Sequence, residues 1–232
     1  MNQSDWINLF VALGTWAAVI VALLVSLGWI TSRAHLEVYL RGEPPDATQI
    51  RSTTPDGRAQ FWSYYWRLRV HNWGPGEAKG VEVQMITLRR KGKTGMERDR
   101  VFLPLDLQWS FGEEQRPRIL RGIFRYCDLV HLDDWTAMRT QPQIVFHNVG
   151  YPSIPNELKL GERPTVKMPG EYELDVAIAA RNARTIRRTI SIKFDDKWWD
   201  NEADMFTKGT QIEVIRAKRH WYERRRKDPL DS

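Results

Sequence analysis

Hydrophobic positions follow two different patterns along the chain, and the change between them lies near residue 32. From Ile7 to Ser32 the run "INLFVALGTWAAVIVALLVSLGWITS" contains no Asp, Glu, Lys, Arg or His. A helix needs about 20 apolar residues to cross a hydrocarbon core of roughly 30 Å. The pattern therefore predicts a transmembrane helix within residues 1–32, with Trp6 and Trp29 near the two membrane interfaces.

A cleaved signal peptide and a buried helix of a soluble protein are the two alternatives for this segment. Signal peptides have a basic start, a shorter apolar region and a small-residue cleavage site. Here Asp5 is the charged side chain before the run, and residues 32–34 read "SRA". A helix that is apolar all round would need a larger protein to bury it. The pattern favours a retained membrane anchor.

After residue 33 the apolar positions recur every second residue, which is the period of a half-buried β-strand. In "FWSYYWRLRVHNW", for example, Trp66, Leu68 and Val70 share one face and alternate with basic residues. Strands are expected at 34–41, 61–73, 81–90, 122–132, 143–147, 170–180 and 185–194, with an edge or irregular segment at 101–110 and a polar loop at 42–57.

The clearest pair of expected strands is a hairpin near the end of the domain. Its apolar positions predict an inward face made of Tyr172, Leu174, Val176, Ile178, Ile190, Ile192 and Phe194. Acidic residues on the first strand and basic residues on the second predict a wet face of opposite charges, which is favourable across a ladder. Between residues 34 and 195 no helical stripe of core length occurs.

Many short strands with turn-rich connections are typical of an antiparallel sandwich or barrel. We therefore predict a mainly β chain with three parts. An N-terminal segment and transmembrane helix occupies 1–32, an antiparallel immunoglobulin-like β-sandwich occupies 33–212, and a basic tail or helix occupies 213–232.

The connection after the second expected strand has a distinctive composition, "HNWGPGEAKGVEV". Asn72 tolerates left-handed backbone and bonds its own main chain, Gly74 and Gly76 permit positive φ, and Pro75 sets a turn residue. A phosphate-binding loop would lead into a helix with Lys and Ser or Thr. This stretch leads into a strand, so it predicts a structural turn.

The same stretch resembles a known family. Its pattern is similar to that of the immunoglobulin-like domains called CARDB and of related bacterial sandwich domains. Here the pattern is occupied by Val70, Asn72, Gly74, Gly76, Ala78, Val81 and Val83. The whole layout also resembles an uncharacterised group of bacterial single-pass membrane proteins that carry such a domain. The resemblance implies the fold and carries no catalytic residue across.

Flanking charge predicts the orientation of the anchor. Arg33 and Arg41 follow the apolar run, and positive residues remain cytoplasmic. We therefore expect a single-pass protein of the inner (cytoplasmic) membrane, with its N-terminus outside and its C-terminal domain inside. The presence of one cysteine, Cys127, agrees with a reducing compartment.

One face of the predicted span consists of small residues at a spacing of four. This transmembrane packing face contains Gly14, Ala18, Ala22 and Ser26. Small residues at this spacing let two helix backbones approach closely in lipid. The stripe predicts a homo-oligomer, and the alternative is the ordinary abundance of such residues in membrane helices.

The search for chemistry yields no catalytic, cofactor-binding or metal-binding residues. Cys127 and His131 share a face of an ideal strand but would lie more than about 13 Å apart, which is too far for a thiol and its base. A zinc site needs four ligands at familiar spacing. We expect an ordinary core cysteine, no cofactor and no enzyme activity.

Residues 194–206, "FDDKWWDNEADMF", are acidic and contain two adjacent tryptophans. A solvated acidic loop is favoured over a calcium site, because the helix-loop-helix calcium pattern is absent. Trp198 and Trp199 face opposite sides of an extended chain, so one ring should be exposed or pack under the loop. An exposed ring would make them contact aromatics.

The C-terminal tail concentrates positive charge. Its basic residues are Arg216, Lys218, Arg219, Arg224, Arg225, Arg226 and Lys227, in a chain of net charge +6. Such a cluster can bind anionic membrane lipid or, less favourably here, nucleic acid through phosphates. A solvated helix end without a ligand is the interpretation that is favoured over both.

Together these features predict a non-enzymatic, membrane-anchored module whose cytoplasmic sandwich binds a protein partner. The alternative is an oligomeric membrane effector of a bacterial stress or anti-phage defence system, in which clustered spans perturb the membrane. A span without polar residues makes a poor water-filled pore, so the effector is the second hypothesis.

Overall fold

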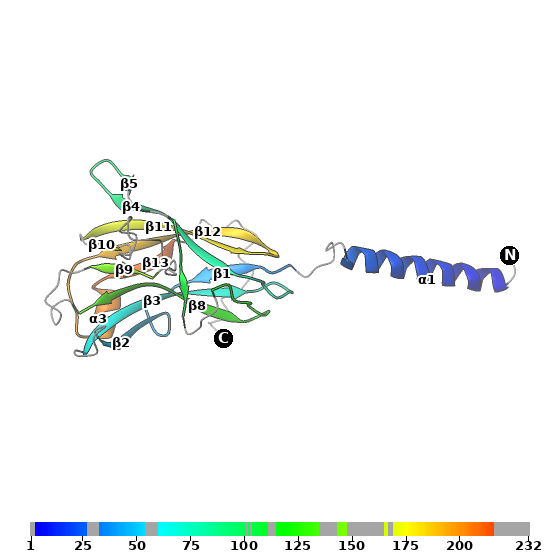
Figure 1. Ribbon diagram of the computed structural model, residues 1–232, viewed down its shortest axis with the longest axis horizontal. Coiled ribbons are helices and arrows are strands. Elements are labelled where there is room, and N and C mark those ends of the chain that lie inside the picture. Colours follow the sequence, from blue (N-terminus) through cyan, green and yellow to red (C-terminus); the bar gives the residue numbers. More distant parts are fainter. Residues whose placement is uncertain are drawn as a thin grey trace, which may run out of the picture.

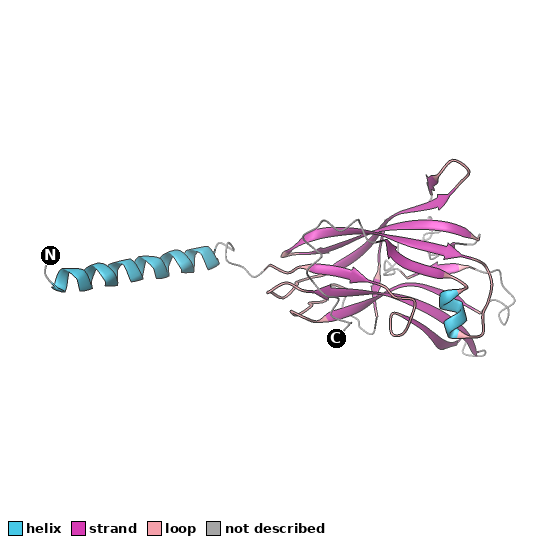
Figure 2. Cartoon of the chain, turned by 180° about the vertical axis from the view of Figure 1, so that it is seen from behind, coloured by secondary structure: helices cyan, strands magenta, loops and turns pink. Residues whose placement is uncertain are grey.

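A computed structural model describes most of the chain and shows an N-terminal helix followed by a β-sandwich (Figures 1 and 2). The described residues are 3–26, 33–53, 60–100, 102, 104–110, 115–134, 143–147, 165–166 and 169–215. The predicted fold class, a mainly β chain with an N-terminal apolar helix and two antiparallel sheets, is confirmed.

Helix α1 (Gln3–Ser26) lies outside the sandwich (Figure 1). Its segment Ser4–Val25 has a mean hydropathy of 2.3, and none of this segment is buried. At about 1.5 Å per residue, 22 residues match the thickness of a bilayer core. Length and composition thus fit a membrane span, and a signal sequence satisfies the same two criteria.

One sheet of the sandwich, here named the β3 sheet after its longest strand, has the order β1-β3-β8-β9-β10, with β2 and β7 pairing onto β3 and β8. Its strands are β1 (Leu36–Tyr39), β2 (Ala47–Thr53), β3 (Gln60–Asn72), β7 (Gln108–Trp109), β8 (Phe124–Asp133), β9 (Ile144–Phe146) and β10 (Thr165–Val166). Every pairing between these strands is antiparallel.

The other sheet, the β11 sheet, has the order β13-β12-β11-β4-β5, with β6 pairing onto β4. Its strands are β4 (Glu82–Lys91), β5 (Met96–Arg98), β6 (Leu105–Asp106), β11 (Gly170–Ala180), β12 (Ala183–Phe194) and β13 (Gln211–Ile215). The short helix α3 (Glu202–Thr207) connects β12 to β13. Strand β13 extends past the expected domain boundary at residue 212.

The core lies between the two sheets and consists of the apolar residues that the period-two pattern assigned to it. Trp66, Leu68 and Val70 of β3 are fully buried, and so are Leu174 and Val176 of β11. Burial of such side chains is the main favourable term in folding. The predicted inward faces of the β3 strand and of the late hairpin are therefore confirmed.

The expected polar loop at 42–57 contains a strand, so that expectation is wrong for its middle part. Strand β2 pairs with the first half of β3, from Ala47 opposite Trp66 to Thr53 opposite Gln60. Its residues lack the strong apolar alternation that signals a strand, because only Ala47 is fully buried. The pairing partner, rather than β2 itself, determines this strand.

A second expectation fails at a β-bulge in β8. Trp66 lies opposite Val130 and Arg67 lies opposite Asp128, so one residue of β8 has no counterpart in β3. A bulge reverses the alternation of faces. Cys127 consequently points into the core opposite Leu68, whereas His131 lies on the outer face, and the two residues do not share a face.

Asn72, the last residue of β3, connects several segments at one end of the sandwich. Its side-chain amide donates to the carbonyl oxygens of Gly76 at 2.7 Å and Ile119 at 2.9 Å. Its side-chain oxygen accepts from the backbone N–H groups of His35 at 3.2 Å and Gly74 at 3.0 Å. The turn predicted from sequence thus also connects three separate segments.

Gly74 is required in this turn because the backbone of residues 33–35 passes directly over it. A Cβ atom there would lie 2.4 Å from both the Arg33 carbonyl oxygen and the His35 nitrogen. Gly74→Ala should therefore lower the free energy of unfolding by about 1–3 kcal/mol, as overpacking of a dense site does. Urea denaturation of the detergent-solubilised chain, followed by tryptophan fluorescence, measures this change.

Gly42→Ala is the matched control, because a Cβ atom at Gly42 would make only ordinary contacts with Phe206 at 3.5 Å or more. We expect its effect to stay within about 0.5 kcal/mol. Equal unfolding midpoints for the two variants would show that the segment 33–35 does not pack on Gly74.

Candidate functional site

The outer face of the β3 sheet is polar but largely buried, which the alternating pattern alone did not predict. The buried polar residues of the domain include Asp46, Ser63, Arg67, Arg69, His71, His131 and His147. Buried ionisable groups are a common mark of functional sites, so this face is the first candidate. Its groups form two separate clusters.

Two ion pairs make up the arginine cluster. Arg67 Nε lies 3.1 Å from Asp128 Oδ1, which also accepts from the Ser110 hydroxyl at 2.5 Å. Arg69 Nη2 lies 3.1 Å from Asp46 Oδ2, and Asp46 is 1% exposed. Burial raises the pKa of Asp46, and the charge of Arg69 opposes that rise. Both arginines are thereby committed to internal carboxylates.

The histidine cluster connects Ser63, Asp133, His131 and His147. Ser63 Oγ donates to Asp133 Oδ1 at 2.7 Å, and His131 Nε2 lies 3.4 Å from Asp133 Oδ2. His131 Nδ1 and His147 Nε2 are 2.8 Å apart, so they share one proton. The ring of Tyr65 stacks on His131 at 5.2 Å between centroids.

This arrangement does not match nucleophilic catalysis. A serine nucleophile needs its hydroxyl proton directed at a base such as histidine, which the carboxylate then orients. Here Ser63 donates to the carboxylate itself. Burial acts to raise the pKa of Asp133, but the hydrogen bonds from His131 and Ser63 outweigh it and lower that pKa. The cluster holds a stable anion and has no activated hydroxyl.

Metal and thiol chemistry find no support in the described residues either. Within those residues, no group of three or more His, Cys, Asp and Glu side chains is arranged to hold a metal ion. The Cys127 thiol is buried and donates to the Gln108 carbonyl oxygen at 3.2 Å. Burial raises the pKa of Cys127 well above its usual value, which keeps the thiol neutral and unreactive.

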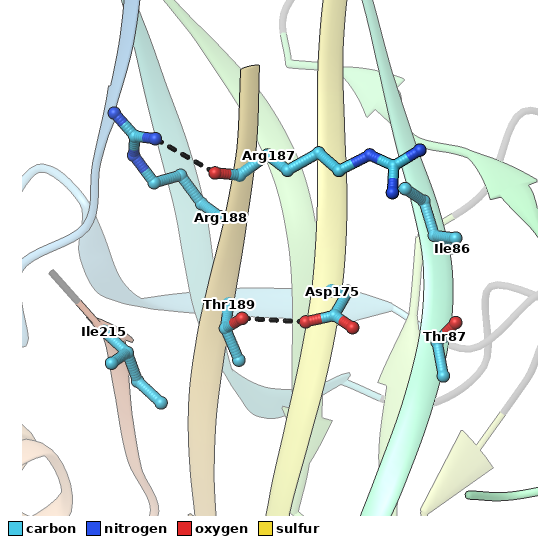
Figure 3. A pocket seen from close by; sticks show the side chains of 7 residues that line it. All are labelled: Ile86, Thr87, Asp175, Arg187, Arg188, Thr189 and Ile215. Atoms are coloured by element: carbon cyan, nitrogen blue, oxygen red, sulfur yellow. Dashed lines mark hydrogen bonds between the residues drawn. The ribbon is translucent and has the colours of Figure 1, made fainter. Parts of the chain in front are cut away.

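The outer face of the β11 sheet is different, because it is open to solvent and contains a shallow pocket of about 330 Å³ (Figure 3). Strands β4, β11, β12 and β13 contribute to it. Its lining residues are Ile86, Thr87, Asp175, Arg187, Arg188, Thr189 and Ile215. This size is at the lower end of small-ligand cavities.

An apolar side chain of β4 lies at the pocket next to a β-bulge. Met85 lies opposite Val176 and Thr87 lies opposite Asp175, so Ile86 has no partner in β11. Because Met85 points into the core, alternation puts Ile86 on the outer face, and the bulge puts Thr87 on that face as well. Ile215, which is 42% exposed, lines the pocket from β13.

The charges around the pocket are arranged unequally. Arg89 holds the Asp175 carboxylate with two bonds, of 2.6 and 3.0 Å, and Thr189 donates to the same carboxylate at 2.7 Å. Desolvation acts to raise the pKa of Asp175, but the bonds from Arg89 and Thr189 outweigh it and lower that pKa. Arg188 turns to the carbonyl oxygen of Arg187, whereas the Arg187 guanidinium extends across the pocket toward Ile86 (Figure 3). The pocket thus offers a cation beside apolar surface.

The tryptophan pair predicted as contact aromatics lies against the core. Trp198 packs on Tyr64 with 4.9 Å between ring centroids, and the Tyr64 hydroxyl donates to the Trp199 carbonyl oxygen at 2.6 Å. Both rings are half-buried, which matches the expectation that a ring packs under the segment. Burial, with neighbouring acidic charges, raises the pKa of Tyr64 to about 12.

The acidic segment is more ordered than the expected solvated loop. Asn201 caps helix α3 by accepting from the Asp204 backbone, and the Glu202 carboxylate accepts from the Gln49 backbone at 2.8 Å. Asp200 accepts from the Trp198 ring at 3.0 Å. These carboxylates therefore hold α3 and the tryptophans in place, and the expectation of a loop is wrong for residues 202–207.

The remaining predicted sites have different outcomes. Gly14, Ala18, Ala22 and Ser26 all lie on α1, at a spacing that keeps them on one face. The basic tail residues at 216–227 lie outside the described residues. The Arg187 pocket was missed because Ile215 lies in β13, within the segment that the sequence analysis assigned to the basic tail, and only the exposed Arg187 on a strand could have indicated it.

His71 makes the stability of the β3 sheet dependent on pH. Its ring lies 4.0 Å from that of Trp73, and burial lowers its pKa below the usual 6.5. The unfolded chain therefore takes up the proton first as pH falls. The stabilisation is complete above about pH 6.5 and is lost progressively as pH falls below that value.

We expect the urea midpoint of the solubilised chain to fall between about pH 7 and about pH 5.5, and His71→Gln to remove part of that slope. His35→Gln, at an exposed histidine, is the control and should leave the slope unchanged. An unaltered slope in His71→Gln would contradict the assignment.

Comparison with known proteins gives no match to any family model, any curated protein or any solved structure. The function of this chain must therefore be inferred from its own geometry.

Proposed function

We propose that the protein is a membrane-anchored, non-enzymatic interaction module whose immunoglobulin-like sandwich binds a protein partner on the cytoplasmic side. The observation that carries this proposal is the open outer face of the β11 sheet, where Arg187 extends over a pocket flanked by Ile86 and Ile215 (Figure 3). Arginine beside apolar surface is the composition enriched in protein interfaces.

The pocket favours a partner with a carboxylate next to an apolar side chain. Arg89 and Thr189 already bind the Asp175 carboxylate, which leaves its oxygens engaged inside the sheet, and Arg89 also pairs with Glu173. Arg187 presents a planar donor that can bind a carboxylate with two bonds. The open, shallow form suits a protruding side chain of a protein better than an enclosed small molecule.

Two side chains that could act as nucleophiles, Ser63 and Cys127, are hydrogen-bonded inside the domain, which supports a binding role over a catalytic one. Ser63 donates to Asp133, and Cys127 is buried with its thiol bonded to a backbone carbonyl. The similarity of residues 70–83 to CARDB-type domains, which are sandwich modules, points in the same direction. Arg33 and Arg41 after the apolar helix support a cytoplasmic domain in the inner membrane.

The proposal predicts site-specific crosslinking from the pocket. With a photoreactive residue in place of Thr87 or Ile215, the full chain in cells should form a discrete crosslinked product. Arg187→Glu should lower its yield by at least about tenfold, because like charges at an interface cost several kcal/mol. Immunoblotting of the irradiated cells measures the product.

Lys193→Glu is the matched control, since it makes the same charge change on the same strand about 20 Å from Arg187. It should leave the product unchanged. Equal loss in both variants, or equal crosslinking from Thr94 in the distant β4–β5 turn, would contradict a specific surface. Protease added to spheroplasts should spare the domain, and its digestion there would contradict the proposed orientation.

A second candidate function, the oligomeric membrane effector, is favoured by the continuity of α1. The helix runs without interruption from Gln3 to Ser26, so one continuous helix carries all four small residues. A Cβ atom at Gly14 would meet no atom within 4 Å, and the exposed stripe leaves room for a second helix.

Ala18→Leu with Ala22→Leu should therefore reduce the chemically crosslinked dimer in membranes by about fivefold or more, because bulky residues separate the two backbones. Val19→Leu with Leu23→Ile on another face is the control. An unchanged dimer yield would show that this stripe is not the contact, and growth arrest that disappears with the dimer would favour the effector.

A further inference from the structure

One end of the sandwich lies toward α1, and we name it the anchor-side end. Four described segments form it: 33–35, 72–80, 118–124 and 180–184. The tip of the β11–β12 hairpin and the start of β1 lie at the end of the domain toward α1 (Figure 1). Ala34 forms a bridge with Ala183, and Trp73 N donates to His35 O at 2.8 Å. These contacts join segments 33–35, 72–80 and 180–184, and a bridge between Ala78 and Ile119 adds segment 118–124.

Exposed apolar side chains gather on this end. Leu120, Ile123 and Phe124 are 59%, 50% and 42% exposed, although they belong to the well-ordered sandwich. Outside α1, the other large apolar residues with comparable exposure in the described part lie apart from one another, at Trp62, Met96 and Ile215. A cluster of this kind marks an interaction surface.

The turn that carries these residues is held rigidly. Ile119 and Ala78 exchange backbone hydrogen bonds of 2.8 and 2.9 Å. Gly122 N donates to Asn72 O at 2.8 Å, and Ile123 O accepts from Asn72 N at 3.1 Å. Gly122 has a φ of 73°, which turns the chain so that Leu120 and Ile123 project outward. The apolar tip is therefore preformed.

Positive charge surrounds the apolar tip. The anchor-side segments contain the exposed basic residues Arg33, Lys79, Arg118, Arg121, Arg181 and Arg184. Glu77 is the acidic residue within these segments, and its carboxylate lies 3.7 Å from Arg118. A basic rim around apolar side chains is complementary to an anionic lipid headgroup layer over acyl chains.

The anchor limits how far this end can lie from a bilayer. Helix α1 ends at Ser26, and Ala34 is already paired with the hairpin. Eight residues reach at most about 29 Å when fully extended. The run also remains uncharged as far as Ser32, so the first charged residue after it, Arg33, already belongs to the anchor-side end.

From these observations we propose that the anchor-side end docks on the surface of an anionic bilayer, with Leu120, Ile123 and Phe124 inserted among the headgroups and the basic rim on lipid phosphates. This inference rests on α1 being a membrane anchor, and it is independent of the protein partner at the Arg187 pocket. Docking would hold the β11 sheet at a defined angle to the membrane.

The test uses the full chain in lipid nanodiscs with a cysteine at Leu120 that carries an environment-sensitive NBD fluorophore. Cys127 is buried and does not compete for the label. Nitroxide groups on the lipid headgroups should quench the probe at least about threefold more in discs with phosphatidylglycerol than in phosphatidylcholine alone. Added salt should reverse the difference.

The matched control carries the probe at Met96, which lies in β5 at the opposite end of the domain (Figure 1). Its quenching should be low and independent of lipid charge. Arg118→Gln with Arg121→Gln should lower the docked population of the Leu120 probe by about tenfold or more. Both arginines are exposed, so the fold should be retained, and the urea midpoint verifies this.

Equal quenching at positions 120 and 96, or the same quenching in neutral and anionic discs, would overturn the proposal. A probe at position 120 that is shielded only in discs with two chains would assign this end to a second copy and would overturn it too. Failure of the chain to co-purify with the discs would show that α1 is not a membrane anchor. That result would contradict both this proposal and the proposed membrane-anchored module.

Discussion

The four side-chain hydrogen bonds of Asn72 are the constraint on which the rest of the domain depends. They fix the start of β1, the turn after β3 and the segment before β8 at one buried point. A buried amide whose donors and acceptors are all satisfied contributes stability. It also disfavours other arrangements of the strands, because a shift of any strand would leave buried polar groups without partners. The close approach of residues 33–35 to Gly74 follows from the same junction. The way the chain enters the sandwich after α1 is set here.

The two sheets use their outer faces in opposite ways. On the β3 sheet the outer face is buried and its charges are consumed in internal pairs, such as Arg69 with Asp46. Leaving either partner alone in such a place would cost more than the pair contributes. On the β11 sheet the outer face is solvated, and Arg187 remains available beside apolar side chains (Figure 3). The β11 sheet is therefore the one on which we propose that a partner protein binds.

The anchor-side end adds a third surface with a different chemistry. There the basic and apolar residues come from turns rather than from strand faces, and the Asn72 junction holds those turns together. Under the proposal that α1 is a membrane anchor, the short connection from Ser26 to Ala34 would keep this end near the bilayer and raise the effective concentration of lipid at the surface. The proposed anchoring, docking and partner binding would thus occupy separate parts of one small protein.

Hydrophobic periodicity by itself determined the apolar helix, most of the strands and the residues that face the core. Those features depend on local spacing, because side chains alternate along a strand and the apolar ones go inward. It did not reveal β2, whose pairing partner in β3 decides its conformation, or the bulges that put Thr87 on the same face as Ile86 and separate Cys127 from His131. Nor did it show that the polar face of β3 is buried. Only the tertiary structure decided these points, because each depends on contacts between segments far apart in the chain, as with Asn72 and Ile119 across 47 residues.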